Sequence, residues 1–130
     1  MCAEAKAEVE AVIRDYYEAL RRGEPLYPYF LEGETTVKVG VSETLYGYDN
    51  VVDGLLEQTR TTDDWTVASH GLVVDDRDGY ATFADEVGLS WTDLETGDRH
   101  DFETRWSGML ERRDEEWLFV SVHVSAPHDL

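Results

Sequence analysis

The spacing of apolar side chains predicts a long amphipathic helix near the start of the chain, from about Ala5 to Gly23. The apolar positions that recur at helical spacing are Val9, Val12, Ile13, Tyr16, Tyr17 and Leu20. Gly23 is the predicted helix stop, because glycine accepts the left-handed conformation that ends many helices, and Pro25 soon follows. One face of this helix is apolar, so we expect a sheet to cover it.

A short helical turn, a strand and a second helix are predicted next. Residues 26–31 contain a proline and read as a helical turn that fills a corner of the core. Residues 35–41 are strand-like in composition, and a loop or short edge strand follows them. Asp49 or Asn50 could cap a helix that runs to about Arg60.

From Trp65 onward the pattern predicts only strands and turns. The predicted strands cover residues 65–74, 80–91, 99–112 and 117–125. Glycine-containing turns separate the first three, and a short polar stretch makes a hairpin of the last two. Helices followed by long antiparallel strands indicate an α+β fold.

The last strand shows a two-residue alternation that we interpret as two different faces. Leu118, Val120, Val122 and Val124 fall on one face, and the other face holds Trp117, Phe119, Ser121, His123 and Ser125. A strand with one apolar face and one face of mixed aromatic and polar residues is what a sheet curled around a pocket requires.

The same hairpin carries a family resemblance. Arg105, the Arg112-Arg113-Asp114 turn, Trp117 and the closing His123-x-Ser125-x-Pro127 resemble the C-terminal hairpin of the SnoaL-like branch of the NTF2-like superfamily. The last strand is also similar to that of the association domain of calcium/calmodulin-dependent kinase. The resemblance spans nearly the whole chain.

The resemblance implies one domain over residues 1–130 with an NTF2-like cone. In this α+β fold a strongly curved, mainly antiparallel sheet wraps around an N-terminal helix, and two further short helices accompany it. It also implies a homodimer through the convex face of the sheet. A physical argument leads to the same expectation, because strands that look apolar on both faces need a second cover besides the helix.

Net charge narrows the classes of partner. The chain has 29 acidic and 11 basic residues, a net charge of −18, and only two lysines, Lys6 and Lys38. Nucleic acid is not an expected partner, because its phosphates require a basic surface. No apolar run of about 20 residues and no basic-then-apolar leader is present, so we expect a cytoplasmic protein without a membrane partner or signal peptide.

Arg105 and His123 are the first candidates for chemistry. Arg105 could pair with one of the many acids, or it could present its guanidinium to a ligand oxygen inside the cone, and the resemblance favours the second alternative. His123, with Ser121 on the same face, could be a structural hydrogen-bond donor or a general base.

Asp85 and Glu86 lie in the middle of an apolar strand, so one of them should face inward. A buried carboxylate is either paired, here with Arg105 on the neighbouring strand, or has a perturbed pKa suited to catalysis. Among the aromatic residues, most of which we expect in the core, Tyr17, Tyr46 and Trp91 are the candidates for a pocket lining.

We expect no metal and no cofactor. The four histidines lack the spacing of a metal site, and no phosphate loop or nucleophile elbow is present. Two enzyme templates within the resemblance also fit poorly. Val39 stands where ketosteroid isomerase-like members carry a base Asp, and a single His123 does not reproduce the paired histidines of scytalone dehydratase-like members.

Three functions remain open at this point. The first, which we favour, is a small-molecule binding domain for an apolar ligand with a polar or acidic end, held by Arg105 and His123. The second is a SnoaL-like isomerase or cyclase that moves protons on an enolisable carbonyl compound, with Asp85, Glu86 or His123 as base. The third is an inert assembly module with a filled cone.

We predict that the chain is adapted to a halophilic cytoplasm. A lysine-poor acidic surface is tolerated in molar salt, where charges are screened within roughly 3 Å at about 1 M. The free energy of unfolding, measured by equilibrium denaturation across a KCl series, should therefore rise with salt. Unchanged stability on dilution into low salt would instead indicate an acidic mesophilic protein.

Overall fold

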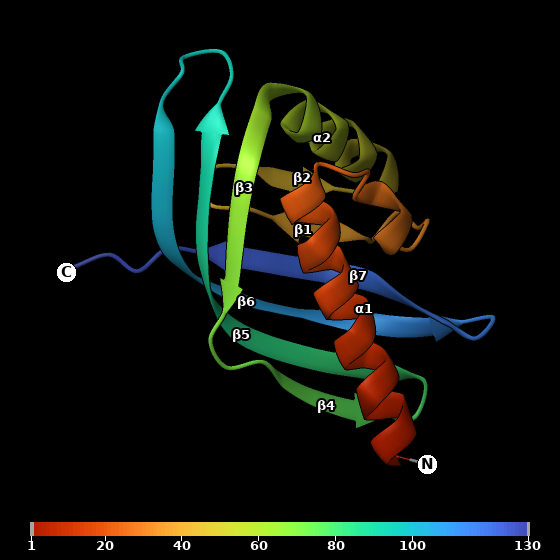
Figure 1. The fold of residues 1–130 in the computed structure, drawn as a ribbon. Helices are drawn as coiled ribbons and strands as arrows, with labels where there is room; N and C mark the ends of the chain where they lie inside the picture. Colours follow the sequence, from red (N-terminus) through yellow and green to blue (C-terminus); the bar gives the residue numbers. More distant parts are fainter. Residues whose placement is uncertain (1, 130) are drawn as a thin grey trace.

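The computed structural model describes residues 2–129, and within them two helices accompany one strongly curved sheet (Figure 1). Helix α1 spans Cys2–Arg22, η1 is a 3-10 turn at Tyr27–Tyr29, and α2 spans Tyr48–Thr61. Side chains are described from residue 4 to residue 129. Helix α1 crosses the concave side of the sheet, while α2 lies beside its upper end.

Seven strands form the sheet, and all neighbours are antiparallel except β1 and β7. The strands are β1 (Val37–Val39), β2 (Thr44–Tyr46), β3 (Thr62–Ser69), β4 (Val73–Arg77), β5 (Tyr80–Asp93), β6 (Arg99–Arg113) and β7 (Glu116–Ser125). Their order is β2-β1-β7-β6-β5-β3, and β4 also pairs with β5. The sheet is strongly curved, stays open and wraps around α1. This arrangement confirms the cone predicted from the sequence.

The element boundaries follow local chemistry, with two corrections. Gly23 takes a φ of +68° and ends α1, as predicted. The cap of α2 is Gly47 without a side-chain hydrogen bond, so the prediction of Asp49 or Asn50 was wrong. The strand predicted over residues 65–74 is interrupted at His70–Leu72 and forms two strands, which pair with different parts of β5.

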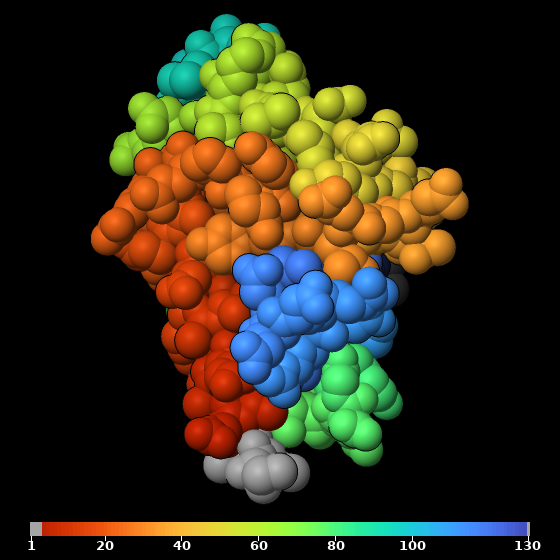
Figure 2. All heavy atoms as spheres, turned by 90° about the vertical axis from the view of Figure 1, so that its right-hand side faces the viewer, coloured from red at the N-terminus to blue at the C-terminus, as the bar shows by residue number. Residues whose placement is uncertain are grey.

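The core fills the space between α1 and the concave face. Inward residues of β5 and β6 alternate with exposed ones, so Phe83, Val87, Trp106 and Leu110 are buried. Helix α1 also contacts β7, where the Trp117 indole donates a hydrogen bond to Glu8. Figure 2 shows this side, with α1 in red beside the blue hairpin.

A β-bulge in β7 corrects the predicted faces of the last strand. Met109 pairs with Ser121 but the next residue, Leu110, pairs with Phe119, so Val120 is an extra residue. One extra residue reverses the alternation. Trp117 and Phe119 therefore face inward together with Val122 and Val124, whereas Ser121, His123 and Ser125 face outward.

The outer face of the long strands is mostly small and polar. Its members on β5, β6 and β7 include Thr82, Ala84, Glu86, Glu103, Arg105, Ser107, His123 and Ser125. The argument for a dimer from strands that are apolar on both faces is therefore wrong. Dimerisation itself stays a prediction.

Gly108 permits the close packing of β6 and β7 beside the bulge. A Cβ at this position would overlap the backbone oxygen of Ser121 and come within 2.8 Å of Phe83 Cε1. Neither neighbour is the free end of a flexible side chain. We expect Gly108→Ala to lower the free energy of unfolding by about 1–3 kcal/mol, as overpacking of a core does.

Gly71→Ala is the matched control, because an added Cβ there meets nothing within 4 Å. Chemical denaturation of both variants would measure the difference. Equal stability of the two variants would show that β6 and β7 separate easily at this point.

Candidate functional site

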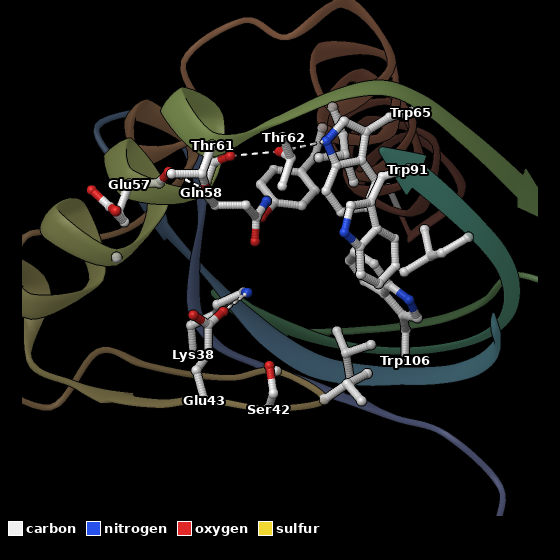
Figure 3. A pocket seen from close by; sticks show the side chains of 17 residues that line it. Lys38, Ser42, Glu43, Glu57, Gln58, Thr61, Thr62, Trp65, Trp91 and Trp106 are labelled. Atoms are coloured by element: carbon white, nitrogen blue, oxygen red, sulfur yellow. Dashed lines mark hydrogen bonds and ion pairs between the residues drawn. The ribbon is translucent and has the colours of Figure 1, made fainter. Parts of the chain in front are cut away.

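A cavity of about 300 Å³ lies between α2, the β1–β2 turn and the concave face of the sheet (Figure 3). Tyr16 and Leu20 of α1 contribute to its lining, as do Trp106 of β6 and Val124 of β7. Its volume is at the small end of the range of about 300–1,000 Å³ that is usual for ligand sites. The site therefore suits a compact ligand.

Three tryptophans form the apolar wall. Trp65 and Trp91 stack with ring centroids 4.7 Å apart and an angle of 18° between the rings. The indole N–H of Trp65 donates to Thr62, and that of Trp106 donates to Thr104. Because these two donors are already used, both rings present apolar surface to the cavity.

A buried ion pair lies across the cavity from the tryptophans (Figure 3). Lys38 occupies the inward position of β1 and is only 6% exposed. Its ammonium nitrogen is 2.5 Å from Glu43 Oε1. Glu43 comes from the β1–β2 turn, and its carbonyl accepts a hydrogen bond from the backbone N–H of Gly40.

The Lys38 ammonium retains hydrogen-bonding capacity that Glu43 does not use. A lysine ammonium carries three donors, and among the side chains described, residues 4–129, the Lys38 ammonium makes one hydrogen bond, to Glu43. Figure 3 shows the nitrogen pointing into the open space below Gln58. A ligand oxygen in the cavity could therefore accept a hydrogen bond from one of the two remaining donors.

Tyr16 and Gln58 supply further polar groups. Burial raises the pKa of the Tyr16 phenol, and the negative charge of Glu43 raises this pKa further, so the phenol stays neutral and can donate a hydrogen bond. Neither the Tyr16 hydroxyl nor the Gln58 amide makes a side-chain hydrogen bond within the described part of the chain. Both residues line the cavity.

Asp85 faces inward, as expected for one of the two acids on β5, but it does not line this cavity. Its carboxylate accepts hydrogen bonds from the Tyr17 hydroxyl at 2.9 Å, the Ser69 hydroxyl at 2.6 Å and the Gly71 N–H at 3.0 Å. Burial and the adjacent charge of Asp85 raise the pKa of Tyr17, which keeps it a donor. This network ties α1 to β5 and to the end of β3.

Arg105 and Glu86 lie outside the cone. They are directly opposite each other on β6 and β5, and both are exposed. Arg105 alternates with the inward Trp106, so it cannot reach the cavity as the predicted anchor. The expected internal pair of Asp85 with Arg105 is also corrected, because these side chains are on opposite faces.

The remaining candidates divide between the cavity and the surface. Trp91 lines the cavity. The bulge turns His123 and Ser121 to the outer face, and Tyr46, on the edge strand β2, is 66% exposed. Of the eight candidates, the cavity therefore includes one.

Sequence reasoning missed Lys38, Glu43 and Gln58. One signal was available for Lys38: it is one of only two lysines, and it stands between two valines in a short strand. An acid-rich chain offers no comparable signal for Glu43, because most of its acids are on the surface. Whether Gln58 reaches the cavity depends on where α2 packs, and the apolar periodicity of α2 does not reveal that position.

No group of three or more His, Cys, Asp or Glu side chains within the described chain is arranged to hold a metal ion. Neither helix in residues 2–129 is long and apolar enough to cross a membrane.

Solved structures with the same fold are numerous but distant in sequence. An NTF2-like superfamily protein from Salmonella enterica serovar Typhimurium has a TM-score of 0.88 at 16% identity, over 99% of this chain and 95% of that chain. A ketosteroid isomerase-like protein from Erwinia carotovora atroseptica has a TM-score of 0.80 at 17% identity, over 97% and 98% of the two chains. At identities this low, the TM-scores show a shared fold and nothing more.

A candidate calcium/calmodulin-dependent protein kinase II association domain from Xanthomonas campestris is also similar. Its TM-score is 0.77 at 20% identity, over 95% of this chain and 88% of that chain. No curated protein sequence matches the chain. The SnoaL-like domain family matches residues 9–129. The chain therefore belongs to the SnoaL-like domain family and has the NTF2-like fold.

Proposed function

We propose that this domain binds a small, mostly apolar molecule with a carbonyl oxygen at one end, and that Lys38 holds this oxygen. The observation that supports the proposal is the buried ammonium of Lys38, which faces a cavity walled by tryptophan. Lys38 replaces Arg105 in the anchoring role that we expected from the sequence.

The charge of the site favours a neutral oxygen over a carboxylate. Lys38 and Glu43 together carry no net charge, and the chain as a whole carries −18. A ligand carboxylate would meet the attraction of Lys38 and the repulsion of Glu43 at similar distances. A carbonyl oxygen accepts from Lys38 without this repulsion, and the neutral Tyr16 phenol provides a second donor.

We expect small aromatic ketones and aldehydes to bind, and Lys38→Met to abolish binding. In molar KCl, a ligand at 100 times its dissociation constant should stabilise the wild type by about 2.7 kcal/mol. Thermal shift and calorimetric titration would measure this across a panel of carbonyl compounds and matched carboxylates. Calorimetry reports binding directly, so altered stability of the variant does not obscure the result.

Lys6→Met is the control. It removes the other lysine, which is exposed on α1, and it changes the net charge by the same amount as Lys38→Met does. It should bind as the wild type does. Equal binding by Lys38→Met, or no binding of any carbonyl compound to the wild type, would contradict the proposal.

A second candidate function is proton transfer on an enolisable ketone. The carboxylate of Glu43 is in the cavity beside two donors, Lys38 and Tyr16, that could stabilise the negative oxygen of an enolate. In this proposal the general base is Glu43 rather than Asp85, Glu86 or His123.

The measurement for this function is exchange of the α-protons of bound ketones with deuterated water, followed by NMR. We expect Glu43→Gln to slow exchange by at least about 10²-fold, the lower limit for loss of a general base. Exchange at the uncatalysed rate in the wild type would leave binding alone as the function. Exchange that persists in Glu43→Gln would place the base elsewhere.

We also propose that the chain forms a homodimer through the outer face of β5, β6 and β7, which neither helix covers. Sedimentation velocity would test this, and a monomer across the accessible concentration range would contradict it. The inert assembly module remains the outcome if neither ligands nor exchange are found.

A further inference from the structure

We infer that Lys38 is also a covalent site, at which its amine condenses with an aldehyde or ketone to form an imine. This inference rests on the proposed binding of a carbonyl compound in the cavity. It goes further, because it assigns a bond to an atom that noncovalent binding uses only as a hydrogen-bond donor.

The position of the amine is the first argument. Lys38 is 6% exposed and its nitrogen points into the cavity, so a carbonyl group can approach it mainly from the cavity (Figure 3). A carbonyl compound bound against Trp91 and Trp106 would therefore have its reactive carbon next to the nitrogen. Holding the reactants together in this way replaces a bimolecular encounter. Lysines in apolar pockets are the usual amines of this reaction in proteins.

Glu43 is the second argument, because the amine reacts only after it has lost a proton. The Glu43 carboxylate, 2.5 Å from the nitrogen, can accept that proton within the existing hydrogen bond. The lone pair of the neutral amine then adds to the carbonyl carbon, and the C–N bond forms as the C=O π bond breaks. Glu43 returns its proton to the resulting oxygen, which gives a neutral carbinolamine once the nitrogen loses its second proton to Glu43.

Loss of water completes the step. Glu43 donates its proton to the carbinolamine hydroxyl, the C–O bond breaks, and the nitrogen lone pair forms the C=N bond. The products are one water molecule and an iminium ion that keeps the positive charge of Lys38. The carboxylate of Glu43 is regenerated beside it, and no oxidant or reductant takes part.

The β1–β2 turn holds Glu43 next to Lys38. The backbone N–H of Gly40 donates to the Glu43 carbonyl at 2.8 Å. A Cβ at Gly40 would come within 2.9 Å of Glu43 Oε1 and 3.2 Å of Lys38 Nζ. The carboxylate therefore stays beside the amine while it accepts protons from the nitrogen and returns them to the ligand oxygen.

The chain provides its own comparison, because it has one other lysine. Lys6 is exposed on α1 and does not line the cavity. An amine that reacts only by collision with solvent aldehyde should favour the exposed Lys6. Faster modification of the buried Lys38 would show that the aldehyde reacts from within the cavity.

The test is reductive trapping of the full chain with benzaldehyde and sodium cyanoborohydride in molar KCl, followed by peptide mass spectrometry. We expect Lys38 to be modified at least about tenfold faster than Lys6, because a carbonyl compound held in the cavity reacts with Lys38 without a bimolecular encounter. Lys38→Arg keeps a cation beside Glu43 but should remove the fast modification. Glu43→Gln should slow it by about 10²-fold, whereas Lys6→Met should leave it unchanged.

Modification of Lys6 as fast as Lys38 would overturn the inference. So would benzaldehyde binding by calorimetry without a borohydride-stable adduct at Lys38, and in that case the proposed noncovalent function would stand. If benzaldehyde and the other carbonyl compounds neither bind nor react, the proposed function fails together with the inference.

Discussion

Tyr16 lies where α1, η1, β6 and β7 meet, and its ring packs edge-on against four other aromatic rings. The centroid distances are 5.5 Å to Tyr29, 5.9 Å to Phe30, 6.1 Å to Trp106 and 5.2 Å to Phe119. Edge-to-face pairs of this kind stabilise by about 0.5–1.5 kcal/mol each beyond the area that they bury. Because these contacts come from η1 with the residue that follows it, from β6 and from β7, they fix the position of α1 on the curved sheet. They also fix the end of the cavity that Tyr16 lines.

Most of the fold could be predicted from the sequence, because periodicity is a local property. The helical spacing of Val9, Ile13, Tyr16 and Leu20 indicates α1, and Gly23 indicates its end. The long strands follow from their composition and turns. The bulge at Val120 could not be predicted, since Leu118 and Val120 are as apolar as Phe119 and Val122 and the alternation looks regular without an extra residue. That single residue decided whether His123 faced the cone or solvent.

The site was less predictable than the fold, for a reason that Lys38 illustrates. A strand reveals which residues share a face but not which face is concave, and β1 is too short to show even its alternation. Arg105 was predicted to anchor a ligand because of its guanidinium and the family resemblance, yet its neighbour Trp106 occupies the inward position. Trp91 could be placed correctly because it continues the inward alternation of β5 through Val87 and Leu89. Pocket residues on long, regular strands are therefore the ones that a sequence can identify.

Gly40 has a consequence for reading related sequences. Its missing side chain leaves the space in which the Lys38 and Glu43 head groups meet, so the three residues form one unit within six positions of the chain. A relative with a larger residue at the position of Gly40 would have to separate the two charges. Lys, Gly and Glu should then be lost together, and the short pattern Lys-x-Gly-x-x-Glu would divide the family into members that keep an amine in the cavity and members that do not.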